Sequence, residues 1–571
     1  MVLPLVVLVG LVLCVALARR AEVSGRELER LDHLERVLAS RAAPIALGVI
    51  NALLVWWWVG WHRNPAPMVQ DEAAYLLQAA LFARGRWTGE APPLPEFFAQ
   101  MHVLTEPVLA SKYPPGFSLL LTPFVAIGFA ALGPMVFAGI TGALVFVLAR
   151  RVAGGPVALL TWVLWSSGSA LLRYQGSFLS QTATVALWLA TLYSALEYRT
   201  HRRPWALVAM GACAGLLAIT RPVTAVALAI PVGVVVVPEV WRARAWRPLA
   251  VAAFTAAVIV ALLPLQNRMT TRDWRLSPLA AYSTKYTPFD FPGFGYTATR
   301  ELAPLPPDLD SLRAFLTEAR RRHTLPALPA TLRSRAWYAT LDIFTGWRAP
   351  LLLFALLGVL AMPTAGLFAL AASAALLFTY AFHAHWAHWT AYYFEGYPAV
   401  VFASAAGLRA FAAWAMQRRP AWRRLRLGST GDLCGDLRGD LRVRAAIVAA
   451  CAFVLIPATI VLPRYRAAWQ RTATYQHRFV TALSLVERES PRSIVFVDYG
   501  SNHDVHSSLV WNVPDLAAAK TWIAYERGPD DLRLMRLAPD RRAYIFRADE
   551  GRLTRLPTLG ELEKIVTMRS K

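Results

Sequence analysis

The sequence predicts an all-α polytopic membrane protein with about 11–12 transmembrane helices and a small α/β soluble C-terminal domain. Of its 571 residues, 56% are hydrophobic and 17% are charged, whereas a soluble domain carries about 25% charged residues. The apolar residues gather in runs long enough to cross a bilayer, and the character of the chain changes after residue 463. These observations exclude a water-soluble enzyme, a disordered chain and a disulfide scaffold.

The apolar runs are the candidate spans, since a spanning helix needs about 20 mostly apolar residues. They lie at 2–18, 42–61, 133–149, 155–172, 180–198, 205–220, 222–240, 249–265, 349–362, 364–382, 397–416 and 445–463. Residues 117–131 are also apolar, and they either extend the third span or form a re-entrant or interfacial helix. We expect three parts: an N-terminal span with a cytoplasmic segment (1–41), a transmembrane domain (42–463) and a soluble outer-face domain (464–571).

Arginine sets the orientation, because short loops rich in Lys and Arg stay in the cytoplasm. Basic clusters lie at 19–41, 150–151, 199–203, 241–247 and 417–444. With these inside, the loops 62–116 and 266–348 and the tail face outward. A net charge of +23 would suggest nucleic acid if it lay on one soluble face. Here the positive charge lies mostly in the short loops between apolar runs. We therefore expect the lipid bilayer as a partner and no nucleic acid.

The tail predicts a small α/β fold. Residues 464–489 have helical character, and short strands are expected at 493–499, 509–511, 521–525 and 543–547, between polar turns. The preceding basic segment, 417–444, contains a Gly-Asp-Leu repeat and is interpreted as a low-complexity linker without a site.

The first outer loop carries an acidic pair, Asp71-Glu72, just beyond a span that ends in tryptophans. Residues 71–84 are amphipathic at helical spacing, which predicts a helix lying in the membrane interface. An acid at a helix start also satisfies free N–H groups and the helix dipole. The pair therefore indicates either a catalytic acid or a helix cap.

Lys112 is the second signal in this loop. The chain has five lysines among its 59 basic residues, so a position that needed only positive charge would more often hold arginine. Lysine is a compact charge on a flexible stem and suits one phosphate oxygen. A lysine that extends toward water from a helix start is the alternative.

Together, these residues resemble the membrane glycosyltransferases of the GT-C fold, which include protein O-mannosyltransferases and lipid A aminoarabinose transferases. The matching motifs are Asp-Glu-Ala-Ala-Tyr at 71–75 and Lys-Tyr-Pro-Pro-Gly at 112–116. The resemblance extends to the multi-span layout, the second outer loop and the soluble outer tail. It departs from the aminoarabinose transferases at the lysine, which stands between Ser111 and Tyr113 rather than in Glu-Lys-Pro.

The resemblance implies an integral membrane enzyme of the cell membrane (plasma or inner), with its active site on the periplasmic or extracytoplasmic side. Such an enzyme transfers a sugar from a polyprenyl-phosphate carrier to an acceptor (lipid, glycan or protein) with inversion. It implies Asp71 as the base and Lys112 as the phosphate contact. Glu72 would orient a neighbour or, with Asp71, bind a divalent metal ion, which some relatives need. Tyr75 and Tyr113 are expected at the donor.

Other candidates lie in the remaining outer segments. Arg221 interrupts an apolar stretch, and a charge there is costly unless it is paired or bound to an anion, so it is a candidate phosphate contact or a turn at headgroup level. The loop 383–398 concentrates His and Tyr and predicts a metal site at His385 and His388, a substrate pocket or an aromatic belt. The candidate pocket residues are Tyr282, Asp290, His388, Tyr392 and Tyr393.

Two other functions fit the span count. A lipid-linked sugar flippase or transporter is one, although the charges lie in outer loops rather than within spans. A polysaccharide polymerase or ligase is the other.

Overall fold

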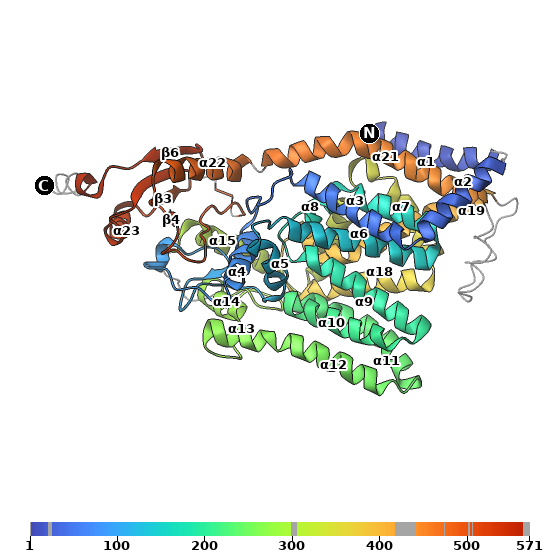
Figure 1. Ribbon diagram of the computed structural model, residues 1–571, viewed down its shortest axis with the longest axis horizontal. Coiled ribbons are helices and arrows are strands. Elements are labelled where there is room, and N and C mark those ends of the chain that lie inside the picture. The colour runs from blue at the N-terminus through green and yellow to red at the C-terminus, as the bar shows by residue number, and fades with distance from the viewer. Residues whose placement is uncertain are drawn as a thin grey trace.

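The computed structural model describes residues 2–20, 25–297, 305–416, 441–472, 474–500, 503–504 and 506–562. Figure 1 shows a long helical body and, at one end of it, a small unit that carries the strands β3, β4 and β6. The structure therefore confirms a mostly helical chain with a small α/β unit. The linker expected at 417–444 lies outside the described residues over 417–440.

Every predicted span falls on helical residues, but 155–172 is divided between two helices bent by 77°, and 249–265 runs from one helix into the next. The helices of the body are α1 (Val2–Arg20), α2 (Gly25–Ala39), α3 (Ala42–Trp58), α6 (Leu132–Ala153), α7 (Gly155–Ser166), α8 (Ser169–Gln175), α9 (Gln181–His201), α10 (Pro204–Thr220), α11 (Pro222–Arg242), α12 (Trp246–Val260), α13 (Leu262–Thr271), α16 (Leu328–Phe344), α17 (Leu351–Ala361), α18 (Thr364–Thr379), α19 (Tyr397–Met416) and α21 (Leu441–Thr472).

Within the described residues, seven helices are long and apolar enough to cross a membrane, and ten if three bent helix pairs each count as one span. Predicted spans at 180–198 and 205–220 lie outside that count and correspond to α9 and α10. The separate helix α5 (Gly116–Ala126) ends before α6 begins. The apolar run at 117–131 therefore does not extend the third span.

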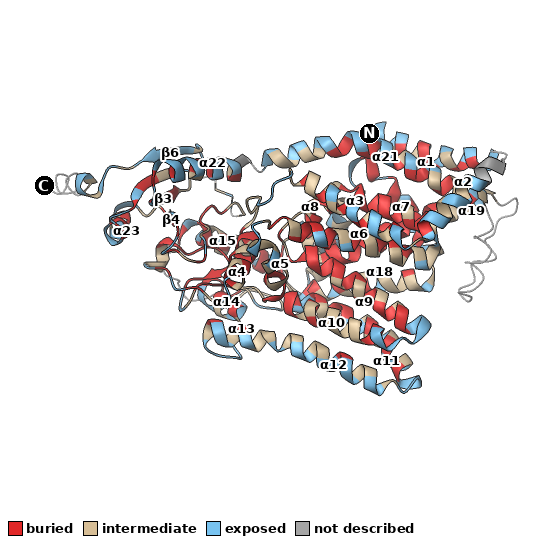
Figure 2. Cartoon of the chain, in the orientation of Figure 1, coloured by how far each residue is buried: buried red, intermediate tan, exposed pale blue. Residues whose placement is uncertain are grey.

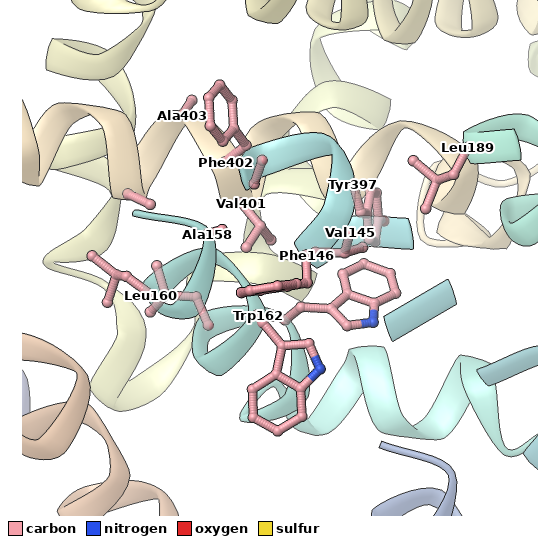
Figure 3. Packing of buried hydrophobic residues seen from close by; sticks show 14 of the residues in the cluster. Val145, Phe146, Ala158, Leu160, Trp162, Leu189, Tyr397, Val401, Phe402 and Ala403 are labelled. Carbon is pink, nitrogen blue, oxygen red and sulfur yellow. The ribbon is translucent and has the colours of Figure 1, made fainter. Parts of the chain in front are cut away.

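Large buried side chains form the core of the body. Phe146, Trp162, Tyr397 and Phe402 come from α6, α7 and α19 and belong to one cluster (Figure 3). Toward the edge, burial decreases (Figure 2). Only 6% of the most apolar window of Trp246–Thr271 is buried, and Phe254 is 70% exposed. A protein surface this apolar suits lipid rather than water.

The outer loops are structured. The loop 62–116 holds α4 (Gln70–Phe82), the short helix η1 (Pro95–Phe97) and the hairpin of β1 (Val103–Leu104) and β2 (Ala110–Ser111). The loop 266–348 holds α14 (Pro278–Tyr286), α15 (Pro307–Arg322), α16 and η2 (Gly346–Arg348). The short helices η3 (Tyr380–Phe382) and η4 (Thr390–Gly396) follow α18.

The tail forms a four-stranded sheet of order β4-β3-β5-β6, in which β5 and β6 are antiparallel and the other pairs are parallel. Its elements are α22 (Thr474–Glu489), β3 (Ser493–Asp498), β4 (Thr521–Tyr525), η6 (Gly528–Asp530), α23 (Asp531–Leu537), β5 (Arg542–Arg547) and β6 (Arg552–Arg555). The boundary expected at 464 falls inside α21, which continues to Thr472.

The strand expected at 509–511 was wrong, although Leu509 and Val510 are fully buried. The side chain of Asn512 explains this. Its Nδ2 donates to the Ile523 carbonyl at 2.8 Å, and its Oδ1 accepts from the Ile523 N–H at 2.9 Å. One amide side chain thus satisfies the β4 backbone groups that a neighbouring strand would otherwise bind. The sequence also gave no indication of β6, which is short and basic.

The sheet docks on both outer loops. Along β3, successive side chains alternate between faces. Val495 and Val497 pack in a cluster with Met101, Tyr282 and Leu309 of the outer loops. Burying each such apolar side chain contributes roughly 1.5–3 kcal/mol. The tail therefore packs against the same loops that carry the first-loop acid.

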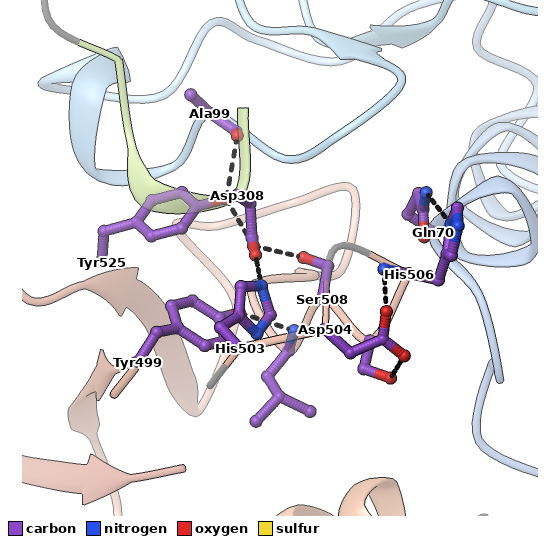
Figure 4. Close-up of polar contacts among 11 residues, drawn as sticks. Gln70, Ala99, Asp308, Tyr499, His503, Asp504, His506, Ser508 and Tyr525 are labelled. Carbon is purple, nitrogen blue, oxygen red and sulfur yellow. Dashed lines mark hydrogen bonds and ion pairs between the residues drawn. The ribbon is translucent and has the colours of Figure 1, made fainter. Parts of the chain in front are cut away.

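One buried carboxylate strengthens this docking. Asp308, fully buried at the start of α15, accepts hydrogen bonds from His503, from the Ser508 hydroxyl at 2.7 Å and from the Tyr525 hydroxyl at 2.8 Å (Figure 4). All three donors belong to the tail. Hydrogen bonds to a charged group contribute more than neutral ones, so Asp308 joins the tail to the second outer loop.

We expect Tyr525→Phe to destabilise the protein by roughly 1.5–3 kcal/mol, because it deletes a hydrogen bond to a buried carboxylate. Thermal unfolding of the purified protein in detergent measures the effect. Tyr338→Phe is the control, since Tyr338 is 42% exposed, and it should leave the unfolding temperature unchanged. Equal unfolding temperatures for Tyr525→Phe and wild type would contradict the role given to Asp308.

Candidate active site

The first turn of α4 places the acidic pair. Val69 is extended (φ −135°, ψ 157°), and the helix begins at Gln70, so Asp71 and Glu72 lie at the positive end of the helix dipole. The prediction of an interfacial helix was wrong. Nine of the 13 residues of α4 are buried within the protein, among them Glu72, Ala74 and Leu77. The helix therefore has no broad face for lipid headgroups.

Asp71 remains partly open. Its side chain is 35% exposed and lies 3.6 Å from Nε2 of His102. The Tyr113 hydroxyl donates a hydrogen bond to Oδ1. Burial acts to raise the pKa of Asp71, but His102, the Tyr113 hydrogen bond and Lys112 outweigh it, so the pKa lies below its usual value. Asp71 is therefore an ionised and accessible carboxylate at neutral pH.

Lys112 lies within electrostatic reach of this carboxylate. Its backbone N–H donates to the His102 carbonyl at 2.9 Å, and Nζ lies 4.9 Å from the Tyr282 ring centroid and 5.2 Å from that of Tyr113. Among the described residues, Nζ has no hydrogen bond or ion pair. Burial lowers the pKa of Lys112, against the opposing charges of Asp71 and Asp290. The two rings position a cation that has not been neutralised by a carboxylate contact.

Nothing in the sequence indicated that His102 lies beside Asp71. This residue has a positive φ of 62°, and its backbone N–H donates to the Tyr282 hydroxyl at 3.0 Å. Burial and Lys112 lower the pKa of His102 to about 3, although Asp71 acts to raise it. The imidazole is therefore neutral at pH 7. A single histidine in a loop has no sequence pattern that would reveal this placement.

Arg221 is paired. Its Nε lies 3.7 Å from Glu395, and its guanidinium donates to the Tyr380 hydroxyl at 2.8 Å. The Tyr392 ring centroid lies 5.5 Å from its Cζ. Tyr75, stacked on Tyr113 at 4.6 Å, lies within electrostatic reach of both Asp71 and Arg221. Arg221 thus belongs to the surroundings of Asp71, with a carboxylate partner that the sequence did not predict.

Glu72 faces away from this centre. Its carboxylate accepts the backbone N–H groups of Met68 at 2.6 Å and Phe178 at 3.0 Å. Each oxygen of Glu72 thus accepts one backbone N–H group, and a divalent metal ion held jointly with Asp71 stays a prediction. Within the described residues, no group of three or more His, Cys, Asp and Glu side chains is arranged as a metal site. The geometry gives Glu72 the task of fixing the turn that carries Asp71.

Burial raises the pKa of Glu72 to about 7, although the N–H groups of Met68 and Phe178 act to lower it. Because this folded-state pKa exceeds the unfolded value, the protonated form favours folding. That contribution is present below about pH 4.5 and is lost as the pH rises through about 7. We therefore expect the unfolding temperature to fall between pH 5 and pH 8, and to fall less in Glu72→Gln. Parallel curves of unfolding temperature against pH for wild type and Glu72→Gln would contradict the raised pKa of Glu72.

The remaining candidates separate into two groups. Tyr282 and Asp290 surround Lys112, and Tyr392 covers Arg221. His388 is exposed, and Tyr393 hydrogen-bonds Nε2 of His385 at 2.9 Å. Since Nδ1 of His385 also lies 2.9 Å from the Trp386 carbonyl oxygen, both ring nitrogens of His385 are engaged. His385 and His388 are thus not arranged as a pair of metal ligands.

Two cavities lie near the centre. One, of about 100 Å³, is lined almost entirely by apolar side chains of α6, α9, α18 and α19 and has Glu395, the partner of Arg221, in its wall. The other, of about 250 Å³, lies behind Glu72 and is lined by Arg173, His62 and His477 among others. An apolar cavity thus adjoins the Arg221 cluster.

No family model and no curated protein match the chain. ArnT from Cupriavidus metallidurans bound to undecaprenyl phosphate is 14% identical, with a TM-score of 0.46 over 89% of this chain and 93% of that chain. Its apo state is 14% identical, with a TM-score of 0.45 over 91% and 90%. The apo oligosaccharyltransferase of Archaeoglobus fulgidus is 12% identical, with a TM-score of 0.27 over 73% and 56%. Because these TM-scores lie below 0.5, function is inferred from the site residues.

Proposed function

We propose that the chain is an integral membrane glycosyltransferase that moves a sugar from a polyprenyl-phosphate-linked donor to an acceptor on the outer face. One observation carries the proposal: a 35% exposed carboxylate, Asp71, lies within electrostatic reach of Lys112, whose Nζ lies over the Tyr282 ring without a hydrogen bond or ion pair among the described residues. Transfer from a sugar phosphate needs both groups, a base for the acceptor hydroxyl and a cation where phosphate charge develops.

In this reaction, Asp71 accepts the proton of the acceptor hydroxyl as its oxygen attacks the anomeric carbon. The bond from that carbon to the phosphate oxygen breaks, and its electron pair leaves with the polyprenyl phosphate. Lys112 stabilises the developing charge. Since one displacement on the face opposite the leaving group inverts the anomeric carbon, we propose an inverting mechanism. Tyr113 orients the Asp71 carboxylate through its hydrogen bond.

The carrier is the second element of the proposal. A polyprenyl chain needs an apolar path, and the cavity between α6, α9, α18 and α19 has an apolar lining, although its volume of about 100 Å³ would hold only a short part of such a chain. Glu395 in its wall is paired with Arg221, so the cavity leads toward a cationic group near Asp71. This arrangement supports a carrier whose chain lies among the helices and whose phosphate reaches the outer end. The active site would then face the extracytoplasmic side of the cell membrane.

The test reconstitutes the purified protein in phospholipid vesicles with a panel of radiolabelled polyprenyl-phosphate sugars and a membrane extract as acceptor source. We expect the label to leave the carrier and enter an acceptor fraction, whose lipid, glycan or protein nature then identifies the acceptor. A glycan acceptor would indicate a polymerase or ligase within the same reaction class. Label that crosses the bilayer with its sugar–phosphate bond intact would replace the proposal with a flippase.

A further inference from the structure

Four rings from three distant segments meet beside the catalytic turn. Phe315 comes from α15, Trp386 and Trp389 from the segment before η4, and His506 from the tail. The Phe315 centroid lies 5.3 Å from those of Trp386 and His506 and 5.4 Å from that of Trp389, and Trp389 lies 5.5 Å from His506. We call this cluster the aromatic platform.

The platform is open to a ligand. All four residues are partly exposed, so their rings are neither core nor fully hydrated surface. Arg322 lies over the Trp386 ring at 5.1 Å and pairs with Glu318 through Nε, which leaves its other N–H groups beside the platform. Within the described residues, Nε1 of Trp386 is buried without a hydrogen-bond partner. Apolar ring faces beside polar donors suit a sugar ring, which presents C–H groups on its faces and hydroxyls around its rim.

The tail holds His506 in the platform. Asp308 binds His503 on one side of the loop and Ser508 on the other, so a single carboxylate fixes both ends of the segment that carries His506 (Figure 4). The Leu509 N–H also donates to the Tyr499 hydroxyl at 2.7 Å. This anchoring reduces the ordering cost that a loop would otherwise incur on binding a ligand.

The platform also reaches the proposed base. Nδ1 of His506 lies 3.4 Å from Nε2 of Gln70, the residue immediately before Asp71 on α4. His506 lies within electrostatic reach of both Asp71 and His102. A ligand lying across the platform would therefore place its next group close to the carboxylate.

From this geometry we infer that the aromatic platform of Phe315, Trp386, Trp389 and His506 binds a pyranose ring of the acceptor, next to the hydroxyl that Asp71 deprotonates. That the bound ring belongs to the acceptor rests on the proposed function. That the platform binds a pyranose ring does not depend on it. The acceptor class would then be a glycan or a glycolipid with a sugar headgroup, rather than an unglycosylated lipid or protein.

Direct binding tests the site without turnover. The purified full chain in detergent is mixed with millimolar methyl pyranosides and short pyranose oligosaccharides, both neutral and amino sugars, and saturation-transfer NMR reports binding. We expect saturation of ring protons with wild type and its loss in Trp389→Ala. Phe315→Leu, which keeps apolar bulk without a ring face, should show the same loss if Trp389→Ala fails to fold. Trp274→Ala is the matched control, because Trp274 is 58% exposed and lies outside the platform.

Kinetics then separates this inference from the proposed function. In Phe315→Leu, the KM for the acceptor should rise about tenfold, equivalent to about 1.4 kcal/mol, while the KM for the donor stays within about twofold. Pyranoside binding that is absent in wild type, or equal in wild type and the platform variants, would overturn the inference. Sugar transfer with an unchanged acceptor KM would overturn it as well and leave the proposed function standing. Pyranoside binding at the platform with no donor cleavage would remove the proposed function and leave the site.

Discussion

Asp71→Asn is expected to lower kcat by about 10²–10⁴-fold, the usual contribution of a general base. The amide keeps the size of the side chain and can still accept the Tyr113 hydrogen bond, but it cannot take the acceptor proton. The KM for the donor should change little, because the phosphate contact belongs to Lys112. Initial rates of transfer from a radiolabelled donor, measured across donor and acceptor concentrations, give both constants.

The control for Asp71→Asn is a measurement of its unfolding temperature, which shows whether the variant is folded. Asp71 is not fully buried, so the unfolding temperature of Asp71→Asn should stay close to that of wild type. Asp71→Glu keeps the carboxylate and displaces it by one methylene group, and we expect it to recover part of the lost rate. A folded Asp71→Asn variant with the wild-type kcat would show that another group takes the proton.

Lys112→Gln is expected to lower kcat by about 10²–10³-fold, which is the usual loss when one preorganised donor to a developing charge is removed. Its ammonium already lies between the rings of Tyr113 and Tyr282, so little reorganisation accompanies the reaction. Lys112→Arg should retain more activity than Lys112→Gln, because it keeps the charge. It should not reach the wild-type rate, since the guanidinium is larger and planar.

Lys285→Gln is the matched control for Lys112. Lys285 is a second lysine of the outer loops, but its Nζ pairs with Glu106 at 2.8 Å and its side chain is 41% exposed. We expect the kcat of Lys285→Gln to stay within about twofold of wild type, since exposed ion pairs contribute little. Equal losses in the two variants would mean that net charge, and not the position of Lys112, governs the rate.

Hydrophobic runs made the helical body predictable, because burial in lipid requires a visible length of apolar residues. The helical character expected at 464–489 is confirmed by the end of α21, which continues to Thr472, and by α22. The composition did not show that the first part of this segment continues the last span. The sheet was predictable where β3, β4 and β5 are apolar. At 509–511 the prediction failed, because Asn512 occupies the edge of β4 with its side chain.

The site residues also divide into those that the sequence indicated and those that it did not. Asp71 and Lys112 could be singled out in the sequence because each stands out locally, one at a helix start and the other as a rare lysine, and their roles stay predictions. Glu72 was assigned a shared role, but successive residues on a helix point about 100° apart, and its carboxylate turns to Met68 and Phe178. That the two side chains point in different directions follows from helix geometry. Which backbone groups the Glu72 carboxylate binds does not follow from it.

Contacts between distant segments could not be predicted from one sequence. Arg221 pairs with Glu395, and Asp308 binds donors of the tail. Each residue alone is an ordinary charge in a loop or at a helix end. The surroundings of His506 could not be predicted for the same reason, since its neighbours Phe315 and Trp389 come from other parts of the chain.

The central claim is that Asp71 and Lys112 catalyse a single displacement at the anomeric carbon of a carrier-linked sugar. Product analysis of one reaction tests it most directly: the polyprenyl phosphate released is counted against the sugar transferred, and NMR gives the configuration of the new bond. We predict one carrier released per sugar transferred, with inverted anomeric configuration. Retained configuration, or transfer without stoichiometric release of polyprenyl phosphate, would contradict the account.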